Sequence, residues 1–184
     1  MVLLVFVCIV LSIIYFLKVV GGGRRILPTI KTFDPATFID KGWKVLEAET
    51  DRRASALEQV DFTKANLETC FKQGETHITG EEKLKRLKEG GNIRLGSETF
   101  LALWTEEGQK TLEWLHGEKG VACFDFFGTI LEGPYNDRFV LRLYRYGYSY
   151  DEGRVFGGWK WDWTYYWLGN DWDDGDYTLC LPAG

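Results

Sequence analysis

The sequence predicts an α+β protein with an N-terminal transmembrane helix, a short helical segment and an antiparallel all-β domain. Three observations support this fold class: an uncharged apolar run at the start, helical spacing between residues 34 and 91, and alternating aromatic residues after residue 92. The 184 residues suffice for one folded unit. Hydrophobic residues make up 45% and aromatic residues 16% of the chain, a composition typical of a folded protein.

Residues 1–20 are predicted to form a transmembrane anchor. The chain has no charged side chain from residue 1 to residue 17, and 17 to 20 helical residues span about 25–30 Å, the thickness of a bilayer core. The apolar run has no basic stretch before it, which favours a retained anchor over a cleaved signal peptide. The small residues 21–23 leave cleavage as the alternative.

Basic residues follow the apolar run and predict the orientation of the chain. Lys18, Arg24 and Arg25 are expected at the membrane interface, where they place the C-terminal domain on the cytosolic side or, in a virus, beside an inner membrane. Residues 21–33 form a basic, glycine-rich linker in this interpretation.

Residues 34–91 carry the patterns of short helices. Asp34 followed by Pro35 is typical of a helix start, and one or two short helices are expected from there to residue 49. Further helices are predicted at 63–72 and 79–89, each followed by glycine. The acids and bases of 79–89 offset one another, which indicates a solvated helix with a thin apolar stripe.

Residues 92–184 change to strand-like alternation with glycine-rich turns, which predicts an antiparallel sandwich, trefoil or three-unit prism. The expected strands are 99–104, 111–115, 121–127, 138–146, 155–163, 164–168 and 177–181. The acidic run 170–176 lacks the spacing of a calcium-binding loop and is predicted to be a solvated turn.

Three stretches of this half share a leucine, a glycine, a polar turn and an aromatic-led strand: RLGSETFLALW, ILEGPYNDRFVLRLY and WLGNDWDDGDYTLCL. Their leading aromatics, Phe100, Phe139 and Tyr177, lie 39 and 38 residues apart, which suggests a threefold repeat. With the turn TEEGQ and the strand TLEW, residues 92–184 resemble the bulb-type mannose-binding lectins. The resemblance implies a three-unit β-prism. The sugar-binding Gln-x-Asp-x-Asn-x-Val-x-Tyr motif of that family is absent from the nearest stretch, Trp104–Trp114.

Two rows of aromatic residues are the candidate binding residues. One row is Tyr144, Tyr146, Tyr148 and Tyr150, and the other is Trp159, Trp161, Trp163 and Trp167. Such rows can form a protein contact, where Trp and Tyr concentrate binding energy, or a platform on which a sugar ring stacks. They can also fill a core, and protein contact with core packing is favoured over sugar binding.

Charge and chemistry exclude other function classes. A formal net charge of −5 opposes binding to a polyanion, so no nucleic-acid partner is expected. Only two histidines are present, and the four cysteines form no Cys-x-x-Cys pair, so neither a metal nor another cofactor is expected. His77 and His116 have no nucleophile motif beside them, and the chain is not expected to be an enzyme.

The sequence therefore predicts a single-pass structural or accessory subunit whose partners are a lipid bilayer and other proteins of a large assembly. Either an energy-converting membrane complex or a virus with an internal membrane, where the chain would be a minor capsid protein or tether, suits this layout. The alternative is a membrane-tethered, lectin-like module that binds a glycan.

Overall fold

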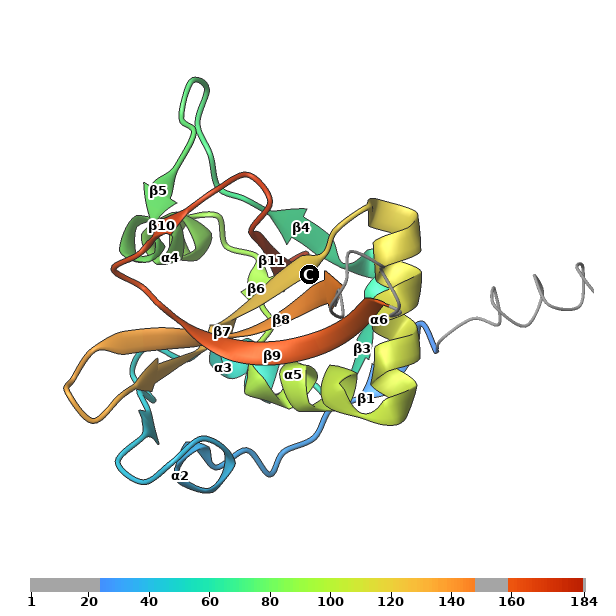
Figure 1. Cartoon of the computed structure of the whole chain (residues 1–184), viewed down its shortest axis with the longest axis horizontal. Coiled ribbons are helices and arrows are strands. Elements are labelled where there is room, and N and C mark those ends of the chain that lie inside the picture. The colour runs from blue at the N-terminus through green and yellow to red at the C-terminus, as the bar shows by residue number, and fades with distance from the viewer. Residues whose placement is uncertain (1–23, 148–158, 184) are drawn as a thin grey trace, which may run out of the picture.

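A seven-stranded mixed sheet organises the chain (Figure 1). The computed structural model describes residues 24–147 and 159–183. The sheet has the order β4-β11-β7-β8-β9, with β2 added to β7 and β6 added to β11. Its strands are β2 (Lys44–Val45), β4 (Asn66–Glu68), β6 (Ile93–Arg94), β7 (Cys123–Glu132), β8 (Arg138–Gly147), β9 (Trp159–Trp167) and β11 (Tyr177–Leu181).

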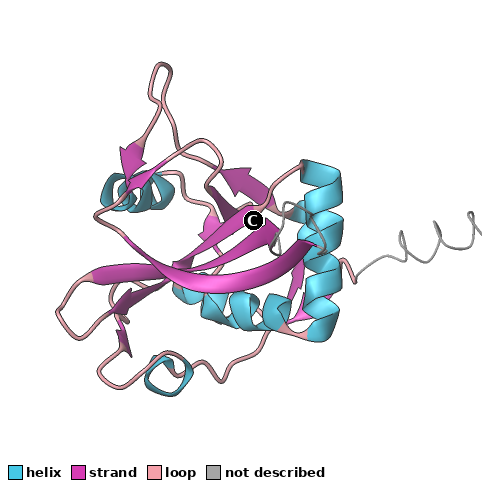
Figure 2. Cartoon of the chain, in the orientation of Figure 1, coloured by secondary structure: helices cyan, strands magenta, loops and turns pink. Residues whose placement is uncertain are grey.

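Two small strand pairs and several helices surround this sheet. The pairs are β1 (Ile26–Pro28) with β3 (Gln59–Asp61), and β5 (Ile78–Thr79) with β10 (Asp171–Trp172). The helices are α2 (Pro35–Phe38), α3 (Arg52–Ser55), the 3-10 turn η1 (Phe62–Lys64), α4 (Gly80–Glu89), α5 (Ser97–Trp104) and α6 (Glu106–Lys119). Figure 2 shows how these helices flank the sheet.

Each face of the sheet has its own hydrophobic core. Helices α5 and α6 pack on one face, where Phe100 and Leu112 meet side chains such as Phe126 and Leu143. Helix α4 and strand β10 pack on the other face, where Leu84 and Leu87 of α4 share a cluster with buried residues of the sheet. That second cluster contains Phe127, Ile130, Val140, Leu168, Trp172 and Cys180. The chain is therefore layered as helices, sheet and helix.

Several predictions from the sequence are confirmed. The helix expected at 79–89 is α4, and its N-terminus is capped by Thr79, whose hydroxyl accepts a hydrogen bond from the Glu82 N–H. The strands expected at 138–146 and 177–181 are β8 and β11. The strands expected at 155–163 and 164–168 form one strand over the described part, β9.

Other predictions are wrong. The strands expected at 99–104 and 111–115 lie in α5 and α6, and the helix expected at 63–72 is replaced by η1 and β4. Phe100 therefore sits in a helix while Phe139 and Tyr177 sit in strands, so the three stretches are not structurally equivalent. The sheet is mixed, because β11 pairs parallel to β7.

Strands from the segment expected to be helical belong to the same sheet as the strands that follow it. Strand β2 pairs with β7, and β4 pairs with β11. The predicted anchor, residues 1–20, lies outside the described residues. Among the residues that the structure describes, no helix is long and apolar enough to cross a bilayer.

The α5–α6 corner generates a prediction about two glycines of one helix. A Cβ at Gly108 would lie 2.1 Å from the Ala102 carbonyl oxygen, whereas a Cβ at Gly117 would have no neighbour within 4 Å. We expect Gly108→Ala to lower the free energy of unfolding by about 1–3 kcal/mol. Gly117→Ala is the matched control and should raise it by about 0.5–1 kcal/mol, since alanine favours helix. Thermal unfolding of the full chain in detergent measures both variants. If both substitutions lowered, or both raised, the free energy of unfolding, the prediction would be contradicted.

Candidate functional site

Strand β9 carries the predicted tryptophan row, and its register shows which way the row faces. Trp167, Tyr165, Trp163 and Trp161 lie opposite Phe139, Leu141, Leu143 and Arg145 of β8. The odd-numbered residues of β9 thus share the face that α5 and α6 cover. The sequence placed these aromatics on one face, and the structure puts that face against the helices.

Only the ends of the tryptophan row are exposed. Trp161 is 5% exposed and stacks on Phe124, with ring centres 5.5 Å apart. Trp163 is half-buried against Phe38. Trp159 and Trp167 are 62% and 44% exposed, and Tyr165, beside Trp167, is 40% exposed. The middle of the tryptophan row therefore belongs to the core, and its two ends lie on the surface.

The tyrosine row is only partly described. Tyr144 and Tyr146 are half-buried on the opposite face of β8, with ring centres 5.9 Å apart. Burial and the nearby Asp162 carboxylate both raise the pKa of Tyr144. Tyr148 and Tyr150 lie outside the described residues.

Among the described residues, β9 is an edge strand that pairs with β8 alone. The Leu168 N–H donates to the Arg138 carbonyl, one position beyond the Phe139–Trp167 pair. Because hydrogen-bonded pairs alternate in an antiparallel ladder, the odd-numbered residues of β9 direct their N–H and C=O groups to the open edge.

Two of these outward groups are already bonded within β9. The Trp163 N–H donates to the Asp162 carboxylate (2.8 Å), and the Tyr165 carbonyl accepts from the Thr164 hydroxyl (3.3 Å). Side chains that satisfy edge groups in this way protect a strand against pairing with another chain. The middle of the edge is therefore poorly suited to strand addition, and the exposed rings at its ends remain available for contact.

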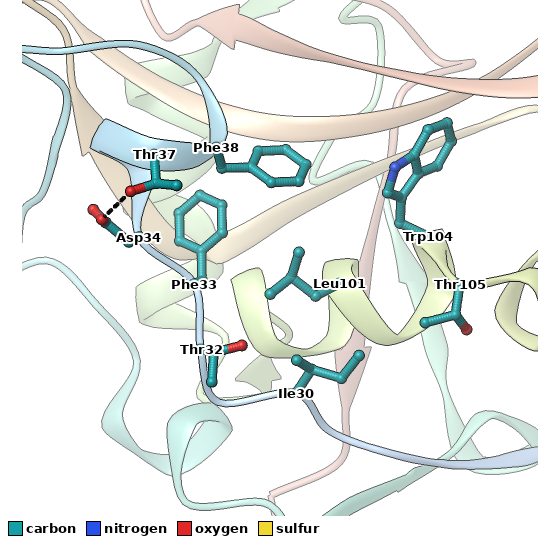
Figure 3. Close-up of a pocket in the computed structure, with 9 residues that line it drawn as sticks. All are labelled: Ile30, Thr32, Phe33, Asp34, Thr37, Phe38, Leu101, Trp104 and Thr105. Carbon is teal, nitrogen blue, oxygen red and sulfur yellow. Dashed lines mark hydrogen bonds between the residues drawn. The ribbon is translucent and has the colours of Figure 1, made fainter.

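A pocket of about 720 Å³ opens between the segment before α2 and helix α5 (Figure 3). Its lining residues are Ile30, Thr32, Phe33, Asp34, Thr37, Phe38, Leu101, Trp104 and Thr105. Several of its polar groups are engaged: Asp34 accepts hydrogen bonds from Ala36 N–H and the Thr37 hydroxyl, and the Thr105 hydroxyl donates to the Ala102 carbonyl. The pocket therefore offers mainly apolar contact to an occupant.

The pocket and strand β9 are joined by aromatic contacts. Phe33 and Phe38 of the pocket have ring centres 5.6 Å apart, and Phe38 lies 4.7 Å from Trp163. The next exposed ring along β9, Tyr165, packs against Trp43 at 4.4 Å. We call the pocket together with Trp163, Tyr165 and Trp167 the aromatic surface.

A cluster of buried charges lies on the other face of the sheet. Asp125 of β7 and Lys83 of α4 are both fully buried, with the Lys83 ammonium 3.6 Å from the Asp125 carboxylate. Arg142 of β8 donates to Asp125 (2.7 Å) and forms an ion pair with Asp176 (2.8 Å). Lys83 also donates to the Asp176 carbonyl (2.5 Å), so two cations and two anions are joined.

This charged cluster does not fit a cation site. The described part of the chain holds one group of potential metal ligands, Cys123, Asp125 and Asp176, whose ligand atoms lie within 4.8 Å of one another. Arg142 and Lys83 already neutralise both carboxylates, so an added cation would meet two positive charges. Burial raises the pKa of Asp125, and the two cations oppose that shift. Lys83, Asp125, Arg142 and Asp176 therefore form a structural network of ion pairs, which we call the charged clamp.

The described cysteines are in surroundings that suppress thiolate formation. Burial raises the pKa of Cys70 to about 11 and that of Cys180 to about 12. Burial also raises the pKa of Cys123, and the neighbouring Asp125 carboxylate adds to the shift. These thiols are therefore weak nucleophiles at neutral pH.

Two of the predicted interface residues are described. Arg24 is exposed, with its guanidinium 3.8 Å from the Glu107 carboxylate, and its carbonyl accepts from the Thr111 hydroxyl (2.6 Å). The Arg25 guanidinium lies 5.2 Å from the centre of the Trp114 ring. Both arginines thus lie against α6. Lys18 lies outside the described residues.

Sequence reasoning missed the charged clamp and the pocket. Two signals for the clamp were available in the sequence. They were Lys83, next to the apolar stripe of α4, and Arg142, inside the strand of residues 138–146. For the pocket no local signal exists, because Phe33 and Trp104 come from segments far apart in the sequence.

The clamp predicts a non-additive pair of substitutions. Asp125→Asn leaves Lys83 and Arg142 with one remaining anion, and it should lower the free energy of unfolding by about 3–5 kcal/mol. Adding Lys83→Met restores charge balance, since Arg142 keeps Asp176, and should recover part of the loss. Denaturant unfolding of Asp125→Asn, Lys83→Met and the double variant measures this coupling. A double variant as unstable as the sum of the two single changes would contradict the clamp.

The raised pKa values of the Cys70 and Cys180 thiols predict slow alkylation. At pH 8 a thiol of pKa about 11, such as Cys70, is about one-thousandth thiolate, so we expect iodoacetamide to modify native Cys70 and Cys180 far more slowly than the unfolded chain. The rate should rise about tenfold for each pH unit. Peptide mass spectrometry separates these sites from Cys8, and rapid labelling of native Cys180 would contradict the assignment.

Comparison of the chain with protein-family models, with curated proteins and with solved structures gave no match.

Proposed function

We propose that this chain is a membrane-anchored accessory subunit that docks other proteins of an assembly through its aromatic surface. The observation that carries the proposal is the contact of the pocket residue Phe38 with Trp163, which shares one strand face with the exposed rings of Tyr165 and Trp167. A concave apolar pocket beside exposed aromatic rings is the usual form of a protein-binding hot spot. The uncharged run of residues 1–17 supports the anchor.

The partner surface should be apolar and should bind through side chains. The pocket presents few free polar atoms, and the outward groups of Trp163 and Tyr165 are bonded within β9. An apolar side chain of a partner could enter the pocket while its neighbours cover Trp167. Either an energy-converting membrane complex or a virus with an internal membrane would supply such a partner.

A glycan is the second candidate, because two exposed rings, Tyr165 and Trp167, stand on one strand face. The residues opposite them, Leu141 and Phe139, are apolar. A sugar site also needs polar groups that bind hydroxyls, and these positions supply none. Protein contact is therefore the better-supported function.

Site-specific photocrosslinking in native membranes tests the proposal. A photoreactive phenylalanine analogue at position 167 should form one discrete adduct with a partner protein, because the ring is exposed on the same strand face as Trp163, which contacts the pocket residue Phe38. The matched control is position 135, an 88% exposed tyrosine between β7 and β8, which should give no such adduct. Trp159→Ala tests the far end of β9 and should change the yield at position 167 little.

Two outcomes would contradict the docking function. Equal crosslinking from positions 135 and 167 would show that exposure alone determines contact. Binding of the full chain to immobilised glycans, lost in Trp167→Ala but retained in Tyr135→Ala, would instead support the lectin-like alternative.

A further inference from the structure

Arg24 and Arg25, together with β1, β3 and the neighbouring part of α6, form a region that we call the corner. Arg24 accepts a hydrogen bond from the Thr111 hydroxyl (2.6 Å), and the Arg25 carbonyl accepts from the Phe62 N–H (2.7 Å). Strand β1, which begins two residues after Arg24, pairs here with β3 (Figure 1). Arg24 and Arg25, the first described residues after the predicted anchor, are therefore fixed to the folded body.

The surface of this corner is basic and partly apolar. Its exposed cations are Arg24, Arg25, Lys64 and Lys110. Asp61 pairs with Lys64, Glu107 pairs with Arg24 and Lys110, and Glu113, beside Trp114, pairs with Arg145.

Two apolar side chains accompany these charges. Ile26 is 47% exposed, and Trp114 is half-buried beneath Arg25. The indole nitrogen of Trp114 is buried, so the exposed part of this residue is its carbon edge. Basic side chains with tryptophan are the combination found where proteins meet the headgroup layer of a bilayer.

The length of the chain before Arg24 limits how far this corner can lie from a membrane. The predicted anchor ends at residue 20, and four residues extend at most about 14 Å. The headgroup layer itself is about 5–8 Å thick on each side of the hydrocarbon core. The corner must therefore lie within or immediately above the headgroups of the bilayer that holds the anchor.

We propose that this corner rests on the lipid phosphates of that bilayer, with Arg24 and Arg25 bound to phosphate oxygens and with Trp114 and Ile26 at the interface. The inference rests on the proposed membrane anchoring. Guanidinium groups bind phosphate oxygens through paired hydrogen bonds, so they suit this position. The contact would fix the orientation of the whole domain, because α6 packs directly on the sheet.

Fluorescence quenching tests this orientation. The full chain is reconstituted in nanodiscs of phosphatidylcholine and phosphatidylglycerol whose acyl chains are brominated near the headgroup, and the quenched fraction of tryptophan emission is compared with that in unbrominated lipid. We expect Trp114→Phe to reduce the quenched fraction to about half, since an interfacial indole lies closest to the bromines. Trp167→Phe is the matched control and should not lower the quenched fraction, because it removes an emitter far from the bromines.

The basic contacts have their own control. Arg24→Glu combined with Arg25→Glu should reduce quenching as Trp114→Phe does, whereas Arg52→Glu, an exposed arginine of α3, should not. Hydrogen exchange supplies a second measurement: amides of 107–117 should exchange about fivefold more slowly in nanodiscs than in detergent, and amides of 133–137 equally fast in both.

The outcomes separate this inference from the proposed function. A chain that does not incorporate into nanodiscs would overturn the anchoring and this inference with it. A chain that incorporates, but whose quenching depends on Trp167 or Trp104 and not on Trp114, would overturn the orientation alone. Unchanged exchange at 107–117 would also overturn the orientation alone.

Discussion

The contact between the Asp125 carboxylate and its two cations is the interaction on which the layered structure depends. Arg142 reaches it from the neighbouring strand and Lys83 from α4, on the far side of the second core. Removing any one of these charges leaves a buried partner uncompensated, which costs far more than an exposed ion pair contributes. The clamp therefore fixes α4 on the sheet, and the aromatic rings of Trp172 and Phe127 surround the Lys83 ammonium.

The odd-numbered aromatics of β9 pack against the face that α5 and α6 cover, whereas Tyr166 packs against Trp172 on the face that α4 covers. In the middle of the row, Trp163 is covered by Phe38 and Phe100, and Trp161 by Phe124 and His116. Trp159 and Trp167, at the ends of the row, are exposed. A partner at the aromatic surface would therefore cover rings that the described part of the chain leaves open.

The sequence predicted those elements whose pattern is decided locally. Strand β8 alternates cleanly, and α4 has its Thr79 cap and its two buried leucines, so both were predictable. Helices α5 and α6 were missed because TFLALW and TLEWL contain β-branched and aromatic residues in short apolar runs, which a strand also accommodates. Their helical signals were the i, i+3 spacing of Phe100 with Leu103 and of Leu112 with Leu115.

The candidate site divides in the same way. That the tryptophans of β9 share one face follows from the two-residue period of a strand. Which of these tryptophans are buried depends on the packing of α5 and α6 against β9. That packing could not be predicted, because residues 99–104 and 111–115 were expected to be strands. The pocket and the clamp join residues from distant segments, such as Lys83 with Asp176, and no local pattern encodes those contacts.

Helix α6 connects the two proposed contact regions. Its Thr111 and Trp114 hold Arg24 and Arg25, while its Glu113 pairs with Arg145 (3.1 Å), whose guanidinium lies 5.1 Å from the Trp159 ring. One end of β9 is thus linked to the proposed membrane corner. Trp167 lies eight residues further along the strand, a distance of about 26 Å at about 3.3 Å per residue. A partner bound at the aromatic surface would therefore lie well beyond Trp159, at a distance set by the rigid sheet and not by the glycine-rich linker.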